Sequence, residues 1–293
     1  MDVSVIIVNY NTGHLLRQAL ASIFDKTQDI EFEVIVVDNS STDNSLEISR
    51  NCFPKVMFIK CENRGFGYAN NEGVKYAKGK YLFFLNPDTI LINNAIKILF
   101  DFMEKNQKCG ICGGNLFTED SHETHSYKMF FPSIFWELNL FFKPGALEML
   151  RYGKDAKFNH STKPMRVGYI TGADLMIRSN LFTALQGFDI DFFVYFEETE
   201  LAYRVKKAGY EVINVPEAEI IHLEGQSFSE NWEKRIKMFL ESRKIFYRKT
   251  SHPLYGAVCN ALFYVGSALR CIVFKMLRNQ EKYRYFKFLR DNM

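Results

Sequence analysis

The chain has 293 residues, of which 47% are hydrophobic and 24% are charged, a composition that is typical of a globular protein and excludes a disordered chain. The length is sufficient for one large domain with appendages or for two smaller domains. The formal net charge of +3 is uneven, because residues 234–293 hold 14 Lys and Arg against three Asp and Glu, a net of +11, which leaves −8 for residues 1–233. An acidic body with a basic C-terminal segment predicts an anionic partner for that segment.

The apolar run 3–8 follows Met1-Asp2 without a basic segment, so we expect no secretory signal and a cytoplasmic protein. The six cysteines are scattered, which agrees with a reducing compartment. One pair, Cys109 and Cys112, precedes His122 and His125, but the spacings are shorter than those of a zinc finger. We therefore favour buried cysteines over a metal or redox site.

Residues 1–115 alternate between strand and helix signals. Runs of apolar residues predict strands over 3–8, 33–37, 56–60 and 81–85, and apolar residues at helical spacing predict helices over 15–24, 45–51 and 69–77. Strands that are apolar on both faces and alternate with helices indicate a mainly parallel sheet, covered on both sides. Ligands of such open α/β folds bind at the carboxyl ends of the strands.

The remainder of the chain is less regular. Residues 128–163 are rich in aromatic side chains and predict loops, whereas 167–178 has strand character and 198–208 predicts a helix. Residues 232–248 form an amphipathic helical pattern. Residues 254–274 are almost entirely apolar, interrupted by Asn260 and Arg270.

Polar residues follow the first two predicted strands. The first strand ends at Asn9 and not in a glycine-rich turn, which argues against a dinucleotide-binding dehydrogenase. The second strand ends at Asp38, whose carboxylate is placed to accept hydrogen bonds from a base or a ribose. The alternative is a turn with a helix N-cap, which fits Asp43 well. Because Asp38 lies directly against the strand, we favour a ligand contact for it.

The next two strands are also followed by polar segments. Residues 62–73 place Arg64 beside two glycines at the start of a helix, which is typical of a phosphate-facing element but is a weak signal alone. The apolar run 81–85 stops at Asn86-Pro87-Asp88. The proline ends the strand and stiffens the turn, and a carboxylate beside phosphates is a natural ligand for Mg²⁺ or Mn²⁺. An ordinary turn is the alternative.

In this order and spacing, the segments VSVIIVNYN, VVDNSSTD, NRGFGYANNEG and LNPDT resemble the family 2 glycosyltransferases, with their GT-A fold. The resemblance covers about residues 3–228 and is closest to the bacterial branch that is similar to rhamnosyltransferases. It implies a metal-dependent enzyme that moves a sugar from a nucleotide diphosphate to an acceptor and inverts the anomeric carbon. The expected fold is an open, mixed, mainly parallel α/β sheet flanked by helices, with a basic helical C-terminal extension.

The resemblance assigns the metal to Asp88 and the nucleobase or ribose to Asp38. The other residues that it places along the nucleotide donor are Asn9, Arg64, Asn70 and Asn86. His222 follows a strand and precedes a glycine-containing loop at 224–227, as in relatives where such a histidine meets metal or diphosphate. A purely structural histidine is an equal alternative.

Two further segments match the family. Residues 172–178 resemble the strand beside the acceptor, which places Asp174 on the acceptor side. Residues 193–204 resemble the segment that carries the catalytic base.

An acceptor hydroxyl is a poor nucleophile until a carboxylate removes its proton. The family usually has Glu-Asp-x-Asp where this chain has Glu197-Glu198-Thr199-Glu200. By position we choose Glu198 as the base, with Glu197 as the alternative. We expect Glu200 to interact with the helix dipole or to orient Arg204.

The C-terminal segment has several possible uses. Residues 254–274 are about long enough to cross a bilayer, but we prefer helices that lie in the headgroup layer, with the cations of 254–293 on anionic lipid. The alternatives are packing on the body of the protein or on a second copy in a homodimer. Nothing in the segment resembles a nucleic-acid-reading module.

These observations predict a catalytic domain over 1–230, with a nucleotide-binding half over about 1–115 and an acceptor half over about 116–230, followed by a helical segment over 231–293. We expect transfer of a sugar to a lipid-linked or growing bacterial surface glycan at the cytoplasmic face of the membrane. The donor expected from the resemblance is dTDP-L-rhamnose, with UDP-linked sugars as rivals. The alternative is a non-catalytic subunit that binds a nucleotide sugar or serves as a scaffold.

Overall fold

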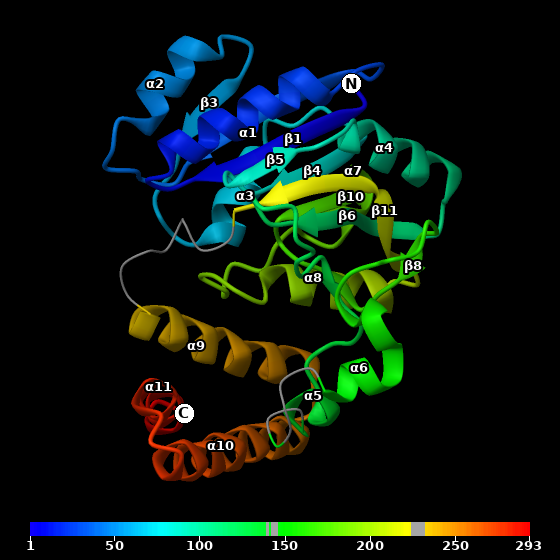
Figure 1. Cartoon of the computed structure of the whole chain (residues 1–293). Helices are drawn as coiled ribbons and strands as arrows, with labels where there is room; N and C mark the ends of the chain where they lie inside the picture. Colours follow the sequence, from blue (N-terminus) through cyan, green and yellow to red (C-terminus); the bar gives the residue numbers. More distant parts are fainter. Residues whose placement is uncertain (139–140, 142–145, 224–231) are drawn as a thin grey trace.

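A computed structural model describes residues 1–138, 141, 146–223 and 232–293 (Figure 1). Its main feature is a nine-stranded sheet in the order β3-β2-β1-β4-β10-β6-β11-β5, with β8 paired to β11, and a separate ribbon of β7 and β9. The strands are β1 Val3–Asn9, β2 Phe32–Asp38, β3 Met57–Lys60, β4 Tyr81–Leu85, β5 Thr89–Leu91, β6 Cys109–Phe117, β7 Tyr127–Lys128, β8 Met165–Arg166, β9 Tyr169–Ile170, β10 Asp174–Arg178 and β11 Glu211–His222.

The sheet is mixed but mainly parallel, as the sequence predicts. β1 pairs in parallel with β2 and β4, and β6 pairs in parallel with β11. β10 is antiparallel to both β4 and β6, so these two strands run in the same direction. Because β10 is reversed, its first residues lie at the edge where β4 ends.

Helices cover both faces of the sheet (Figure 1). They are α1 Gly13–Lys26, α2 Ser45–Cys52, α3 Phe66–Val74, α4 Ala95–Lys105, α5 Ile134–Leu138, α6 Ala146–Tyr152, α7 Ser179–Ala184, α8 Glu197–Lys207, α9 Trp232–Thr250, α10 Pro253–Met276 and α11 Gln280–Asp291. Alternate residues of β1 enter different cores: Ile7 packs with α1 and α4, and Ile6 packs with α3, α7 and α8. This two-sided burial explains the continuous apolar run of β1.

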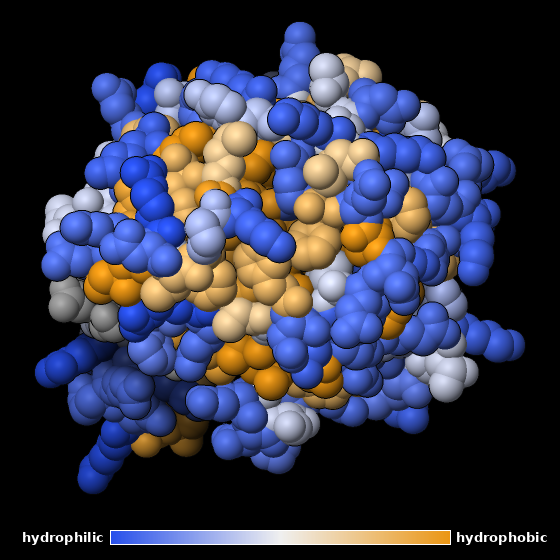
Figure 2. All heavy atoms as spheres, turned by 90° about the horizontal axis from the view of Figure 1, so that it is seen from above, coloured by the Kyte–Doolittle hydropathy of each residue, from blue (hydrophilic) through white to orange (hydrophobic). Residues whose placement is uncertain are grey.

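Figure 2 looks down on the side of the molecule that carries α1 and α2. Hydrophilic side chains border this face, and apolar side chains are visible between them. Partly buried aromatic residues pack on the core beneath α1, α2 and α4, among them Phe24, Phe53 and Phe100.

Three predicted segments differ from the structure. The predicted helix 69–77 begins three residues earlier, at Phe66, because Gly65 turns the chain with a φ of 110°. The predicted strand 167–178 is two strands, β9 and β10. The segment 128–163, which predicts loops, contains the short helices α5 and α6.

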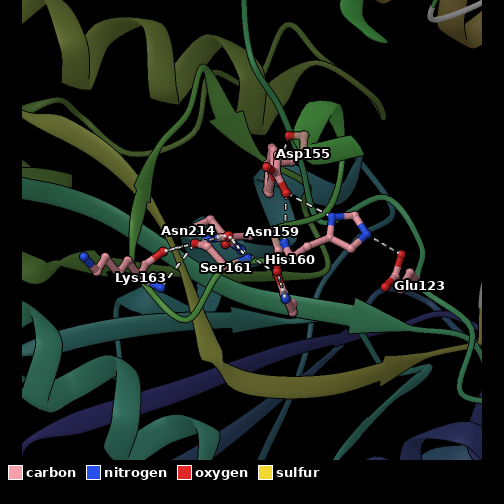
Figure 3. A network of polar contacts seen from close by, with 9 residues as sticks. Glu123, Asp155, Asn159, His160, Ser161, Lys163 and Asn214 are labelled. Atoms are coloured by element: carbon pink, nitrogen blue, oxygen red, sulfur yellow. Dashed lines mark hydrogen bonds and ion pairs between the residues drawn. The ribbon is translucent and has the colours of Figure 1, made fainter. Parts of the chain in front are cut away.

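A network of polar contacts holds the segment between β6 and β8 (Figure 3). The ring of His160 lies between Asp155 Oδ1, 3.0 Å from Nδ1, and Glu123 Oε2, 2.7 Å from Nε2. Burial alone would raise the pKa of Asp155, but the hydrogen bonds from the backbone and ring of His160 lower it. Asn115, at the end of β6, donates to the backbone oxygen of Asn159 at 2.8 Å, which joins this network to the main sheet.

The C-terminal helices α9, α10 and α11 pack on one another and on the body (Figure 1). Arg243 of α9 and Glu137 of α5 are both fully buried and form an ion pair with Nη2 and Oε1 2.6 Å apart. Arg243 also donates to Asn260 Oδ1 at 2.6 Å and to the Cys259 carbonyl at 3.0 Å, and Tyr247 donates to Glu137. A buried polar cluster therefore joins the basic segment to α5.

Candidate active site

Asn9 and Asp38 lie side by side where β1 and β2 end. Asn9 Nδ2 donates to Asp38 Oδ1 at 3.1 Å and to Ser41 Oγ at 3.0 Å, and Thr12 donates to Asn9 Oδ1 at 2.8 Å. Asn9 is fully buried and Asp38 nearly so. Asn9 thus orients Asp38 and the loop that follows it. The contacts of both residues with a nucleotide stay predictions.

The loop before α3 is fixed against the loop before α8. The Phe66 amide donates to the Phe193 carbonyl at 2.8 Å. A Cβ at Gly65 would lie 2.4 Å from that same oxygen, and Gly65 has a positive φ, so the position requires glycine. Arg64 is exposed at the start of this helix, with its guanidinium 4.4 Å from the centre of the Tyr68 ring. The expected donor-side loop is therefore held beside the segment that leads to Glu197.

The consecutive residues Asn70 and Asn71 of α3 have different roles. Asn70 is buried and donates to the Phe66 carbonyl of its own helix at 3.1 Å. Asn71 Nδ2 donates to the Phe188 carbonyl at 2.8 Å, and the Phe188 amide donates back to Asn71 Oδ1 at 2.9 Å. Asn71 therefore clamps the beginning of the segment 188–196.

Asp88 and His222 meet at the end of β4. His222 Nε2 lies 3.4 Å from Asp88 Oδ1 and 3.5 Å from Asn86 Nδ2. The Leu223 amide donates to the Asp88 carbonyl at 2.9 Å, which fixes the end of β11 beside the turn. The structure thus brings together three of the predicted site residues. The loop 224–227 after His222 lies outside the described residues.

An oxygen ligand and an imidazole at this distance suit a divalent cation such as Mn²⁺ or Mg²⁺. Within the described ranges, no group of three or more His, Cys, Asp and Glu side chains is arranged to hold a metal ion. Asp88 and His222 are the described residues here that could hold such a cation together with oxygens of a phosphate and water. That division of the ligands between protein, phosphate and water is usual for Mg²⁺ at phosphate sites.

Glu197 and Glu198 begin α8 after a strained turn, in which Tyr195 and Phe196 both have φ of 69°. Glu197 is buried, whereas Glu198 is partly exposed and accepts a hydrogen bond from Thr199 Oγ1 at 3.1 Å. Burial raises the pKa of Glu198. Burial, together with the neighbouring Glu198, raises the pKa of Glu197 well above its ordinary value.

Contacts link these carboxylates to the turn that holds Asp88. The Asn86 amide donates to the Ala173 carbonyl at 3.0 Å. The preceding residue, Gly172, faces Glu198, since a Cβ there would lie 3.8 Å from Glu198 Cγ. The reversed strand β10 therefore brings Glu198 to the same edge of the sheet as Asp88.

Asp174 is fully buried inside the sheet, and its Oδ2 accepts a hydrogen bond from the Gly114 amide at 2.5 Å. Burial raises its pKa well above the ordinary value. The expected acceptor-side role of Asp174 stays a prediction. The expectation of buried cysteines at Cys109 and Cys112 is confirmed.

A comparison with protein-family models matches residues 4–165 to the family described as "Glycosyl transferase family 2". The match covers more than half of the chain. The chain belongs to glycosyl transferase family 2. The resemblance in the sequence motifs is thereby confirmed.

Among curated relatives of this glycosyltransferase, the rhamnosyltransferase WbbL of Escherichia coli K12 is 24% identical over 251 residues, which are 82% of this chain and 90% of the relative. An N-acetylglucosaminyl-diphospho-decaprenol L-rhamnosyltransferase of Mycobacterium tuberculosis H37Rv is 25% identical over 265 residues, 83% of this chain and 82% of the relative. An uncharacterized glycosyltransferase of Rickettsia bellii is 34% identical over 106 residues, and this match covers 36% of the chain but only 15% of that much longer relative.

Solved glycosyltransferases share the fold. A mannosyltransferase of Pyrobaculum calidifontis in complex with GDP-Man and Mn²⁺ has a TM-score of 0.58 at 16% identity, covering 99% of this chain and 83% of that one. GalNAc-T7 with UDP, GalNAc and Mn²⁺ also has a TM-score of 0.58, at 19% identity, covering 84% of this chain and 50% of that one. At these identities the likeness shows the GT-A fold alone.

The site of this glycosyltransferase includes residues that sequence reasoning missed. Thr199 donates a hydrogen bond to Glu198, Gly172 faces Glu198, and Asn71 clamps Phe188. Thr199 and Gly172 lie inside the motifs that carry the resemblance, and Asn71 follows Asn70 directly. Their place in or beside these motifs could have pointed to them in the sequence. The sequence does not show which of two adjacent asparagines on a helix faces the neighbouring segment. The expectation that Glu200 orients Arg204 is confirmed, with Nη2 and Oε2 2.7 Å apart.

Proposed function

We propose that this chain is an inverting, metal-dependent glycosyltransferase that uses a nucleotide-diphosphate sugar. The observation that supports this proposal most directly is the convergence of Asp88, His222 and Glu198 at one edge of the sheet, through the contacts of Asn86 and Gly172. A site that grips a diphosphate at one end and presents a carboxylate at the other is what sugar transfer requires.

In the proposed reaction, Glu198 takes the proton of the acceptor hydroxyl as its oxygen attacks the anomeric carbon from the face opposite the leaving group. The bond from that carbon to the diphosphate oxygen breaks, and its electron pair leaves with the nucleoside diphosphate. Glu198 is suited to this role because it is partly exposed and because burial raises the pKa of its carboxylate, which makes it a stronger base. The hydrogen bond from Thr199 fixes one of its oxygens.

A divalent cation held by Asp88 and His222 would supply positive charge for the leaving diphosphate. Asn86 lies within 3.5 Å of His222 and would hold the imidazole in place. At the other end of the donor, Asp38 would accept hydrogen bonds from the base or ribose, in the orientation that Asn9 gives it. Arg64 would lie along the diphosphate, and Asn70 would support the start of α3.

For the donor, we propose dTDP-L-rhamnose. This choice is supported by two relatives with rhamnosyltransferase in their names, each matched over more than 80% of its length. UDP-linked sugars are the rivals, because a carboxylate at Asp38 meets uracil and thymine alike. For the acceptor, we propose a lipid-linked or growing bacterial surface glycan at the cytoplasmic face of the membrane.

The test is a panel of nucleotide sugars, assayed for thermal stabilisation and slow hydrolysis with and without Mn²⁺ or Mg²⁺. A donor that binds the folded protein stabilises it by mass action. We expect one donor to raise the melting temperature only with metal and to be hydrolysed. Asp88→Ala should lose both the metal-dependent stabilisation and the hydrolysis, and wild-type turnover in this variant would refute the metal assignment.

The same panel distinguishes the enzyme from a non-catalytic subunit. Metal-dependent stabilisation by a nucleotide sugar without hydrolysis, and without transfer to any glycan acceptor, would support a binding or scaffolding role. Glu198→Gln provides the reference, because it should bind the donor without turning it over.

A further inference from the structure

The helix α10 has two faces of different composition. One face packs against the rest of the protein and consists mainly of small residues, with buried Gly256, Cys259, Phe263, Gly266, Ser267 and Cys271. The opposite face points to solvent. Its exposed large apolar side chains are Leu254, Tyr255, Val258, Tyr264, Val265, Leu269, Ile272, Val273 and Met276. Lys275, in the last turn of the helix, is exposed as well.

This exposed face differs from that of an ordinary amphipathic helix, which carries charged residues toward water. Ile272 is 57% exposed and Met276 is 78% exposed. Between Pro253 and Phe274 the sequence has one charged residue, Arg270, and its guanidinium lies 5.0 Å from the centre of the Phe286 ring of α11. An apolar strip along a 24-residue helix marks a surface that a partner covers.

The charge around the strip favours an anionic partner. Residues 234–293 carry a net charge of +11, and the exposed cations in the last turn of α10 and beyond it are Lys275, Arg278, Lys282, Arg284 and Lys287. A second copy of this chain would bring an equal positive charge against the first and would be repelled. A lipid surface with anionic headgroups offers both an apolar layer and the opposite charge.

The packing of α10 fixes how it meets such a surface. By length and composition α10 could cross a membrane, and it is the one helix in the described part of the chain for which this holds. Its small-residue face, however, packs against α5, α9 and α11, so the helix is not free to be surrounded by lipid. An orientation parallel to the membrane plane leaves this packing intact and buries only the exposed strip.

We propose that α10 docks the protein on an anionic lipid surface, lying in the plane of the membrane with its strip of exposed apolar side chains among the headgroups and upper acyl chains. Figure 1 shows α10 at the end of the molecule that lies farthest from the sheet, with α9 between α10 and the body. On the inner side of α9, Ser242 Oγ donates at 2.7 Å to the Val194 carbonyl, three residues before Glu197.

The membrane would therefore lie on the far side of α9 from the segment that carries Glu197 and Glu198. This position suits an acceptor with a lipid anchor, and that part of the inference rests on the proposed function. The docking itself does not depend on it.

The experiment is flotation of the full chain with vesicles of phosphatidylcholine alone, and of phosphatidylcholine with about one third phosphatidylglycerol. We expect binding to the anionic vesicles, weaker binding to the neutral ones, and release by high salt, because each basic residue near the surface contributes roughly fivefold to binding at low ionic strength. Val265→Glu/Ile272→Glu places two charges on the strip and should weaken binding by at least about tenfold.

A matched control carries the same two charges on exposed apolar residues of the body, Ile48→Glu/Tyr76→Glu, and should bind vesicles like the wild type. Melting temperatures of both variants establish that they are folded. Absence of binding by the wild type, or equal binding by the strip variant, would overturn the proposal. So would a wild-type dimer that becomes a monomer in the strip variant while vesicle binding is unchanged, because the strip would then join two copies.

Donor hydrolysis in solution separates this inference from the proposed function. The strip variant should hydrolyse the donor at the wild-type rate, because α10 contributes no residue to the proposed site. If neither protein hydrolyses any donor but only the wild type binds vesicles, the docking stands and the proposed reaction fails.

Discussion

Arg243 is a charged side chain with no exposed surface, and its removal should be costly. Its guanidinium contacts the carboxylate of Glu137 through Nη2 at 2.6 Å and Nε at 3.2 Å, and it donates to Asn260 and to the Cys259 carbonyl. Arg243→Met removes the positive charge but keeps most of the side-chain volume. Glu137 then remains buried with Tyr247 as its hydrogen-bond donor.

Breaking a buried ion pair by removal of one partner costs about 3–5 kcal/mol. For a chain of this size, 1 kcal/mol corresponds to about 2–4 °C in melting temperature, so Arg243→Met should melt roughly 6–20 °C below the wild type. Thermal unfolding followed by circular dichroism measures the difference. The adjacent Lys244 is exposed, and Lys244→Met should melt within about 2 °C of the wild type.

The double variant Glu137→Met/Arg243→Met completes the test. Replacement of both buried charges by apolar side chains should recover most of the lost stability, because no unpaired charge remains. If Arg243→Met and Lys244→Met melt alike, the pair between α5 and α9 does not form. The basic segment would then not be anchored to α5 in the way described.

Two further predictions concern the carboxylate segment. Burial raises the pKa of Glu197, so the folded protein binds the proton of this carboxyl more tightly than the unfolded chain does. The folded state therefore loses stability as the pH rises from the ordinary pKa of 4.5 through the raised pKa. Glu197→Gln has no such titrating proton, so its melting temperature should rise relative to that of the wild type between pH 5 and pH 8. A difference between the two melting temperatures that does not change with pH would contradict a buried Glu197. Asn71→Ala removes the two hydrogen bonds to Phe188. It should lower kcat about tenfold or more with little change in donor Kd, because small displacements of catalytic groups are costly to the rate. An unchanged kcat would show that these hydrogen bonds do not position Glu198.

The sequence predicts the fold of residues 1–115 well and that of the remainder poorly, for physical reasons. β1, β2 and β4 are buried on both faces, so their apolar runs are unambiguous, and Asp38 and Asp88 follow from where those runs stop. β10 could not be oriented from its sequence, because only the tertiary pairing shows that it is antiparallel to β4. The position of Gly172 opposite Glu198 depends on that reversal.

The C-terminal helices show the same limit. An apolar pattern over 254–274 predicts a helix, and α10 confirms it. It does not show that small residues face the protein and large ones face outward, since both are apolar. Arg243 and Glu137, 106 residues apart, look like ordinary surface charges in the sequence, and only the fold shows that they are buried together.

The role of Glu198 as catalytic base is the central claim, and Glu198→Gln tests it most directly. Donor affinity measured by calorimetry with Mn²⁺ should stay within about twofold of the wild type, because the amide keeps the shape of the carboxylate. The kcat for sugar transfer should fall by about 10²–10⁴, the usual contribution of a general base. Wild-type turnover in Glu198→Gln, or a loss that occurs in Glu197→Gln instead, would contradict the assignment.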